Sequence, residues 1–312
     1  MGDIRRNRSN LESFIAHTTP VVPAYPLKKL QASTLDLNSS CIQSFHDKEY
    51  IILRDLWDTF TESSAYGVGV PIILDNCKSV VQYYVPYLSA IQLYTYKSLA
   101  ASSILQEESE TESLSDDSES EKLSRPWDAV SEDSDQNDSW SPRELLGKLY
   151  LQYIEYASPY RRIPLIDKVH ELSLNYPGLT SFKSMDISPA SWISIAWYPI
   201  YQIPTCTNAK DLSTCFLTYH TISASFQDST APEGMAKDSF GATEDIVRNQ
   251  KRVSKCLSIS PFGLATYKMQ GSLWRNPQAS DDDTISSLYI AAYSWLKQLG
   301  VDHHDFDFFA TH

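Results

Sequence analysis

Apolar residues recur at helical spacing in several separate stretches of the chain. A spacing of i, i+3, i+4 and i+7 places side chains on one face of a helix, where they can pack against a core. Residues 53–60 follow this spacing with Leu53, Leu56, Trp57 and Phe60. The segments 165–176 and 281–299 follow it too. The pattern therefore predicts a helix in each of these segments.

Capping signals predict where further helices begin and end. Ser9-Asn10-Leu11-Glu12 has the spacing of a capping box, which marks the start of a short helix. Ser141-Pro142-Arg143-Glu144 has the same signature and predicts a helix that runs to about Tyr156. Pro177-Gly178 should end the helix at 165–176, and Gly300 should end the helix at 281–299.

The longest region with strand character is Ala65–Tyr96. It predicts a short strand at Pro71–Leu74, a turn at Asp75-Asn76 and a long strand at Lys78–Tyr96, where β-branched and aromatic residues dominate. Pro86 lies inside the long strand. Because proline has no N–H to donate to a ladder, we expect it at a sheet edge or at a bulge.

The second half of the chain contains further strand patterns. Ser191–Pro204 and Asp211–Ser225 are neighbours in sequence and should pair as an antiparallel hairpin. Phe262–Trp274 predicts another strand, and residues 226–254 are polar and predict a loop. In the tail, Val301–Phe309 alternates polar and apolar residues, which predicts an edge strand.

These elements together predict an α+β fold with a mainly antiparallel β-sheet flanked by helices, because no βαβ rhythm is present. Composition changes sharply within the chain: residues 102–141 are acidic and serine-rich, and the run EESETESLSDDSESEK within them has almost no apolar side chains. Such a segment cannot bury enough surface to offset its chain entropy, so we expect it to be disordered. We therefore expect residues 1–101 and 142–312 to form one domain that this insert interrupts.

The insert carries most of the net charge of -13. Between Glu107 and Asp138 there are 13 acidic residues and two basic ones, a net charge of -11, which leaves -2 for the rest of the chain. Ser109, Ser113 and Ser118 each have an acidic residue three positions later, the pattern that an acidophilic kinase prefers. The insert is thus either a phosphorylated regulatory segment or a solvated spacer.

Charge and cysteine content exclude several classes of protein. A nucleic-acid binder normally presents a basic face, so the acidic balance argues against that class. The five cysteines form no CxxC pair, which favours reduced thiols in a reducing compartment. No segment approaches the apolar run of about 18 residues that a membrane span needs. A cytoplasmic or nuclear protein with protein partners, and without membrane insertion, is the expectation that remains.

One cluster of residues suggests chemistry. It lies in Asp302-His303-His304-Asp305-Phe306-Asp307. If this tail is extended, the imidazole of His303 and the carboxylates of Asp305 and Asp307 share one face and could bind a divalent metal ion. In an enzyme, His303, His304 and Asp305 would be the catalytic candidates. The alternative is a polar edge strand whose charges discourage pairing with other chains. No zinc-ligand spacing and no nucleotide-binding or hydrolase motif accompanies the cluster, so we expect no metal and no cofactor.

Aromatic residues gather on the predicted strands. They either pack a half-buried sheet, with their polar tips in water, or line a groove for a peptide or small ligand. The groove candidates are Tyr84, Tyr87, Trp197 and Tyr198.

Long blocks of the chain resemble the plant family called domain of unknown function 789. The blocks include SNLESFIAHTTPVVPAYPL, SPASWISIAWYPIYQIPT, FGLATYKMQGSLW and SWLKQLGVDHHDFDFF. The resemblance implies a soluble plant protein, and it implies no activity, cofactor or catalytic residue. We therefore expect a non-enzymatic interaction or regulatory protein with a phosphorylatable acidic insert. The alternative is an enzyme of unrecognised type that uses the C-terminal His/Asp cluster beside an aromatic pocket.

Overall fold

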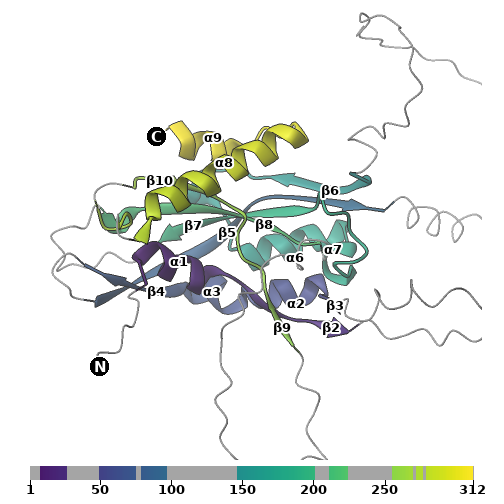
Figure 1. Ribbon diagram of the computed structural model, residues 1–312. Coiled ribbons are helices and arrows are strands. Elements are labelled where there is room, and N and C mark those ends of the chain that lie inside the picture. Colours follow the sequence, from purple (N-terminus) through teal and green to yellow (C-terminus); the bar gives the residue numbers. More distant parts are fainter. Residues whose placement is uncertain are drawn as a thin grey trace, which may run out of the picture.

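Strand β5 (Ser79–Thr95) is the central element of the fold (Figure 1). On one side it pairs with β7 (Trp192–Pro199). On the other side its first half pairs with β4 (Val68–Ile73) and its second half with β6 (Lys148–Ile154). Pro86 lies in the short interval of β5 between the parts that pair with β4 and with β6. No strand on that side would accept a hydrogen bond from residue 86, so a proline without an N–H is tolerated there.

The computed structural model describes residues 8–26, 49–74, 79–96, 146–200, 211–223, 255–269, 272–276 and 279–311. Within these ranges the main sheet is antiparallel and runs in the order β10-β8-β7-β5-β4, with β6 also paired to β5. The predicted hairpin is confirmed, because β7 pairs antiparallel with β8 (Cys215–Thr221). The outermost strand, β10 (Gly263–Tyr267), is shorter than the segment Phe262–Trp274 predicted for it.

The predicted helix that ends near Tyr156 is wrong, because its described part forms strand β6. Residues 148–154 satisfy their backbone groups along the second half of β5, where Leu151 opposite Leu93 is buried. Leu and Tyr at mixed spacings fit both a helical stripe and a half-buried strand, and the free edge of β5 selects the strand. The proposed cap at 141–144 lies outside the described residues.

The predicted edge strand in the tail is also wrong. Residues 304–311 form helix α9 (His304–Thr311), which buries Phe306 and Phe309, three positions apart. That spacing places both rings on one helix face, against the sheet. The alternation of polar and phenylalanine residues resembles the pattern of a strand. A helix of only about two turns has too few residues for its own spacing to stand out.

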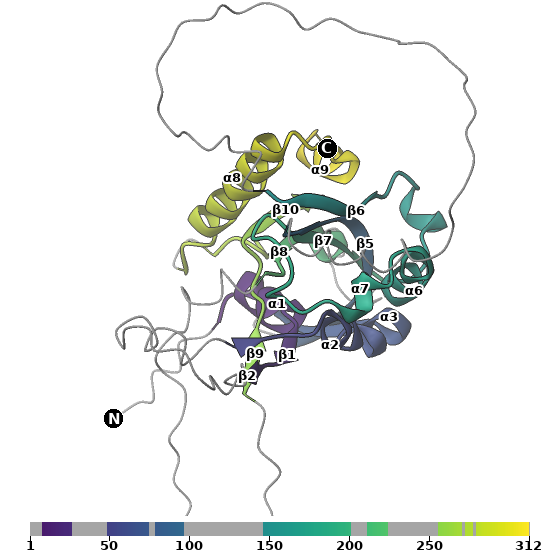
Figure 2. The ribbon, with the colours of Figure 1, turned by 90° about the vertical axis from the view of Figure 1, so that its right-hand side faces the viewer.

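Helices cover both faces of the sheet (Figures 1 and 2). Two helices lie over one face: α8 (Asp281–Leu299) and α9. The other face carries α1 (Asn10–Thr18), α2 (Leu53–Asp58), α3 (Thr61–Tyr66), α6 (Leu165–Asn175) and α7 (Gly178–Ser181). The capping box of Ser9 and Glu12 is present, and Gly300 ends α8, as predicted.

Short elements complete the described chain. They are the ribbons β1 (Val21–Pro23) with β9 (Cys256–Ser258) and β2 (Tyr25–Pro26) with β3 (Glu49–Tyr50), and the 3₁₀ turns η2 (Pro159–Arg161) and η3 (Asp211–Ser213). Among the residues that the structure describes, no helix combines the length and the apolar character needed to cross a membrane.

The two faces of the sheet have separate hydrophobic cores. Under α1, Phe14 stacks on Phe216 with ring centroids 3.9 Å apart, and Trp274 packs edge-on against Phe216. Under α8 and α9, the core is built around Trp192 and Tyr219. A Cβ atom on Gly263 would lie 2.8 Å from the Cβ of Ala292, so this glycine lets α8 approach β10 closely.

Candidate functional site

A bulge in β5 lies at a buried polar site that joins several elements. The register of β5 shifts between Leu88 and Ala90, and Ser89 is the additional residue. A bulge of this kind turns a side chain away from the regular alternation. The bulge lets Ser89 and Ala90 both face the side of α8 and α9, and the Ser89 hydroxyl points toward the start of α9, where it contacts His303 and Asp305.

Five side chains form one hydrogen-bonded series, here called the polar chain: Tyr219, His303, Ser89, Asp305 and Arg162. The Tyr219 hydroxyl lies 2.7 Å from His303 Nδ1, and His303 Nε2 lies 2.9 Å from Ser89 Oγ. Ser89 Oγ donates to Asp305 Oδ2 at 2.5 Å, and Arg162 donates to both carboxylate oxygens at 2.7 and 2.6 Å. These residues come from β8, β5, the end of η2 and the C-terminal segment.

Donor and acceptor counts determine where each proton lies. An ionised Asp305 only accepts hydrogen bonds, so Ser89 must donate to it and must accept from His303 Nε2–H. His303 Nδ1 is then an acceptor, and the Tyr219 hydroxyl donates to it. The polar chain therefore runs in one direction, from Tyr219 to the carboxylate, and contains a neutral imidazole.

Burial and charge pairing set the protonation states. Burial lowers the pKa of His303 to about 4, which agrees with a neutral ring at pH 7. Burial opposes the charged form of Asp305, but the bidentate contact with Arg162 outweighs it and holds the pKa of the carboxyl below its usual value. The same pairing raises the pKa of Arg162.

The polar chain contains Ser, His and Asp, but it lacks the geometry of a nucleophilic triad. Asp305 contacts Ser89 and leaves His303 Nδ1 to Tyr219, and His303 Nε2 donates to Ser89, so the imidazole does not accept the serine proton as it would in a triad. Exposure is 0% for Ser89, 1% for His303, 2% for Asp305 and 9% for Arg162. A substrate could not reach these atoms, and the arrangement joins α9 and the η2 loop to the sheet.

The sequence-based candidates in the tail thus differ in burial, although His304 Nδ1 lies 3.6 Å from Asp305 Oδ1. His303 and Asp305 belong to the polar chain, whereas His304 lies at the surface, its ring centroid 5.7 Å from that of Tyr156. Nothing in the sequence pointed to Ser89, Arg162 or Tyr219. The only local signal was a serine within the apolar stretch YVPYLSAIQLY. Within the described ranges, no group of three His, Cys, Asp or Glu side chains could hold a metal ion.

The aromatic candidates are divided between the two faces of the sheet. Tyr84 and Trp197 are buried in the core under α1, each with its ring near Phe14. Tyr87 and Tyr198 lie on the opposite face, with ring centroids 5.9 Å apart. These four side chains therefore do not line a common groove. Tyr198 instead packs against α9 and under the Arg162 guanidinium.

The β4–β5 hairpin exposes an apolar surface, here called the hairpin face: Pro71, Ile73, Val81 and Tyr83. Ile73 is 44% exposed and Val81 is 47% exposed, while Val70 and Ile72, which alternate with Pro71 and Ile73 along β4, are fully buried. Tyr83 and Tyr87 lie four positions apart in β5, so their side chains point to the same side of the sheet. The hairpin face is therefore continuous with the sheet face that α9 covers further along. Ile200, 40% exposed, adjoins it through a backbone bond to Tyr83.

The backbone edge of this hairpin is closed even though its face is exposed. The Asn10 amide bonds both the N–H and the carbonyl of Ile73, each at 2.8 Å. Ser13 donates to the carbonyl of Pro71. Side chains of α1 therefore occupy the edge positions where another strand would otherwise add.

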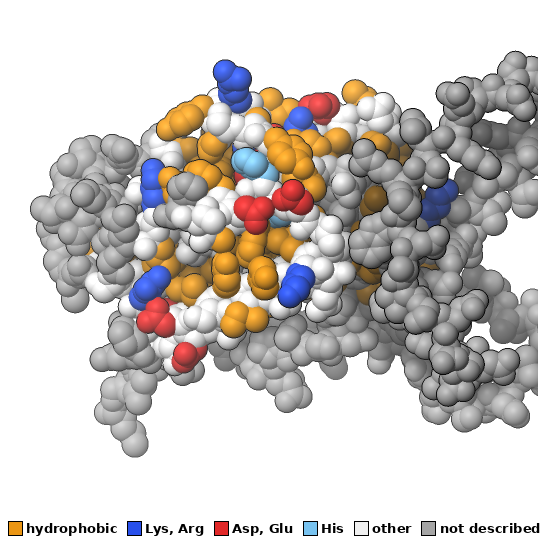
Figure 3. Space-filling model, turned by 90° about the horizontal axis from the view of Figure 1, so that it is seen from above, with side chains coloured by type: hydrophobic (Ala, Val, Ile, Leu, Met, Phe, Trp, Pro, Cys, Tyr) orange, Lys and Arg blue, Asp and Glu red, His pale blue; other side chains and the backbone are white. Residues whose placement is uncertain are grey.

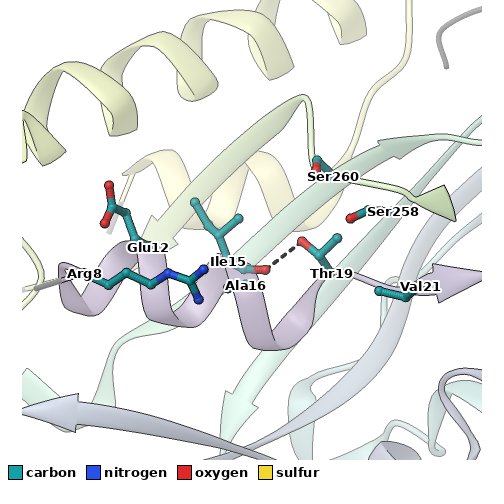
Figure 4. Close-up of a pocket in the computed structure, with 8 residues that line it drawn as sticks. All are labelled: Arg8, Glu12, Ile15, Ala16, Thr19, Val21, Ser258 and Ser260. Carbon is teal, nitrogen blue, oxygen red and sulfur yellow. Dashed lines mark hydrogen bonds between the residues drawn. The ribbon is translucent and has the colours of Figure 1, made fainter. Parts of the chain in front are cut away.

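Two further surfaces are open to solvent. A groove of about 580 Å³ runs between α1 and the β1–β9 ribbon, and Figure 4 shows its lining residues: Arg8, Glu12, Ile15, Ala16, Thr19, Val21, Ser258 and Ser260. The face that carries α8 and α9 shows hydrophobic side chains among charged ones (Figure 3). Ile290 and Tyr293 of α8 are 61% and 50% exposed there.

The acidic insert joins β5 to β6 in the sequence. The phosphorylation candidates Ser109, Ser113 and Ser118 lie outside the described residues, as does the whole polar segment 226–254. The strands on either side of the insert, β5 and β6, pair with each other.

Comparison with known proteins identifies a family. The model of the family described as protein of unknown function (DUF789) matches residues 9–309, so the chain belongs to this family. This confirms the resemblance that the sequence blocks indicated. No curated protein and no solved structure matches the chain.

Proposed function

We propose that this member of the DUF789 family is a non-enzymatic interaction protein, with the hairpin face as a contact surface for a protein partner and the acidic insert as a regulatory element. The observation that carries the proposal is the exposure of adjacent apolar side chains on one ordered sheet face, with Ile73 and Val81 each more than 40% exposed. Exposed apolar patches of this kind mark interaction sites.

The closed edge of β4 defines how a partner would bind. Because Asn10 and Ser13 occupy the edge backbone, a partner gains little by adding a strand there. It would pack apolar side chains flat on the hairpin face instead. None of the four described residues that define the hairpin face is charged, so we expect a hydrophobic contact with weak salt dependence.

The enzyme alternative has less support. It requires a reactive group that a substrate can reach, and His303 and Asp305 are both at most 2% exposed. Their hydrogen-bonding capacity is engaged by Tyr219, Ser89 and Arg162. In our proposal these residues serve stability. Cys215 is a free, buried cysteine, which suits a reducing compartment, and we propose the cytosol or the nucleus.

The test compares charged substitutions in the full-length protein. Val81→Glu and Ile73→Glu should each weaken partner capture in native cells by roughly 5- to 30-fold, which corresponds to losing an interface residue worth about 1–2 kcal/mol. The measurement is quantitative proximity labelling of each variant. Leu174→Glu is the matched control, because Leu174 is an apolar residue on α6 that is 84% exposed. Equal labelling in all three variants would count against the hairpin face.

A second arm examines the insert. Deletion of residues 103–140 should change the set of labelled partners. A variant with the same length but with Asn and Gln in place of Asp and Glu distinguishes charge from spacing. If charge is the regulatory element, this neutral variant should behave like the deletion. Partner sets identical to the wild type in both variants would reduce the insert to a spacer.

A further inference from the structure

The loop between β6 and α6 is held firmly at both ends and exposed in its middle. Glu155 accepts hydrogen bonds from the Tyr153 hydroxyl and the Ala157 N–H, at 2.7 and 2.8 Å. At the other end, Arg162 is paired with Asp305 and donates through Nε to the Ala157 carbonyl. Between these anchors, Ser158 and Arg161 are exposed, and Tyr160 is 100% exposed.

This part of the loop has the sequence Ser158-Pro159-Tyr160-Arg161. A serine followed directly by proline and by a basic residue three positions later is the pattern that proline-directed serine/threonine kinases recognise. Ser158 has φ -62° and ψ 153°, the extended conformation that a residue before proline prefers. Its hydroxyl makes no hydrogen bond to any part of the chain that the structure describes.

The other Ser-Pro and Thr-Pro pairs within the described ranges lack this combination. Ser188 is completely buried, and its hydroxyl accepts from the Ala190 N–H. The Thr19 hydroxyl donates to the Ile15 carbonyl at 2.6 Å. Ser260 is exposed, but Gly263 stands three positions after it.

We propose that Ser158 is a phosphorylation site for a proline-directed kinase that reads Arg161. In the reaction, Ser158 Oγ attacks the γ-phosphorus of ATP and forms a new O–P bond. The bond from that phosphorus to the β–γ bridging oxygen breaks, ADP leaves, and the serine proton passes to the base of the kinase. This site is independent of the hairpin face, and it differs from the acid-directed serines of the insert.

A kinase can reach this segment at small cost to the fold. Extending it would open the η2 turn, which is closed by two backbone hydrogen bonds, Arg161 N–H to Ser158 and Arg162 N–H to Pro159. The anchors at Glu155 and Arg162 lie outside the recognised residues. After transfer, the phosphate would stand near Arg161, which makes no ion pair among the described residues and could therefore pair with it.

The test uses the folded full-length protein with a proline-directed kinase and Mg-ATP, and peptide-level mass spectrometry locates the phosphate. We expect phosphate on Ser158, and none there in Ser158→Ala. Arg161→Ala should slow the modification at least roughly tenfold, a typical cost of losing one charged contact. Ser260→Ala is the matched control, because it removes the exposed Ser-Pro pair without a basic residue at the third position.

A synthetic peptide of residues 153–166 separates the two requirements of the proposal. Phosphorylation of the peptide but not of the folded protein would show that the fold hides Ser158, and would overturn the proposal. Failure of both would show that the residues are not recognised, and would overturn it equally. An unchanged rate in Arg161→Ala would remove Arg161 from the proposed recognition.

Discussion

At the scale of single residues, the polar chain shows how one bulge organises a buried site. Regular alternation alone would not place Ser89 beside Ala90 on the face toward α9. The bulge supplies the hydroxyl that connects His303 to Asp305. With Arg162 on the other side of the carboxylate, the charge of Asp305 is compensated in a place that water does not reach.

This pairing predicts a large effect of removing the Asp305 charge. Asp305→Asn leaves the Arg162 guanidinium buried without its counter-ion, so the free energy of unfolding should fall by about 3–5 kcal/mol. Urea denaturation measures the change. The exposed Asp302→Asn variant is the control and should change stability by less than about 0.5 kcal/mol.

A double variant tests the reason for the loss. In Arg162→Met with Asp305→Leu, apolar side chains replace both ions, and much of the lost stability should return, because no buried charge remains. A double variant as unstable as Asp305→Asn would contradict an electrostatic explanation and would point to packing at this position.

At the scale of elements, two helices end at glycines with left-handed backbone. Gly67 follows α3 with φ 77° and ψ 160°, and Gly300 follows α8 with φ 63° and ψ 36°. The Gly300 conformation is one that other residues adopt at moderate cost, whereas the Gly67 conformation is essentially restricted to glycine. A Cβ on Gly67 would also lie 3.0 Å from Ile200 Cδ1, and nothing lies within 4 Å at Gly300.

These two glycines form a matched pair of variants. Gly300→Ala should lower the free energy of unfolding by about 1 kcal/mol, through backbone strain alone. Gly67→Ala adds a steric clash to a larger strain and should cost about 2–3 kcal/mol. Thermal or urea unfolding of both variants gives the comparison. Equal losses at Gly300 and Gly67 would show that neither the clash nor the larger backbone strain at Gly67 contributes.

At the scale of the whole molecule, histidines buried in both cores couple stability to pH. His303 lies in the polar chain. His220 lies in the opposite core, where its Nδ1 bonds the Ile259 carbonyl and its Nε2 bonds the Thr218 hydroxyl. Burial lowers the pKa of each histidine to about 4. In the unfolded chain, both rings would titrate near their ordinary pKa of about 6.5.

The direction of the pH dependence follows from these values. Between about pH 6.5 and 4 the unfolded chain binds more protons than the folded one, so acid favours unfolding. The stabilisation is complete above pH 6.5 and is lost as the pH falls toward 4. At pH 5 each buried histidine should lower the free energy of unfolding by about 2 kcal/mol relative to pH 7. Urea titrations at both pH values measure the loss, and His220→Gln should remove about half of it.

Structural features that depend on neighbouring residues could be predicted from the sequence, whereas features that depend on contacts with distant segments could not. The start of α1 follows from its capping box, and the bounds of α6 and α8 follow from apolar spacing and from the proline and glycines at their ends; these predictions were confirmed. The hairpin of β7 and β8 followed from their adjacency in sequence. The predictions for β6 and α9 failed, because each short segment fits two periodicities and only its distant neighbours select one.

The site shows the same division between local and distant causes. The amino-acid sequence by itself determined the α+β class, the segregation of charge into the insert and the apolar character of the strands. Only the tertiary structure decided that Ser89, Arg162 and Tyr219 would meet His303 and Asp305, from positions up to 216 residues apart. It also decided that the hairpin face would remain exposed. The reason is physical, since burial and hydrogen-bond partners depend on which distant segments the folded chain brings together.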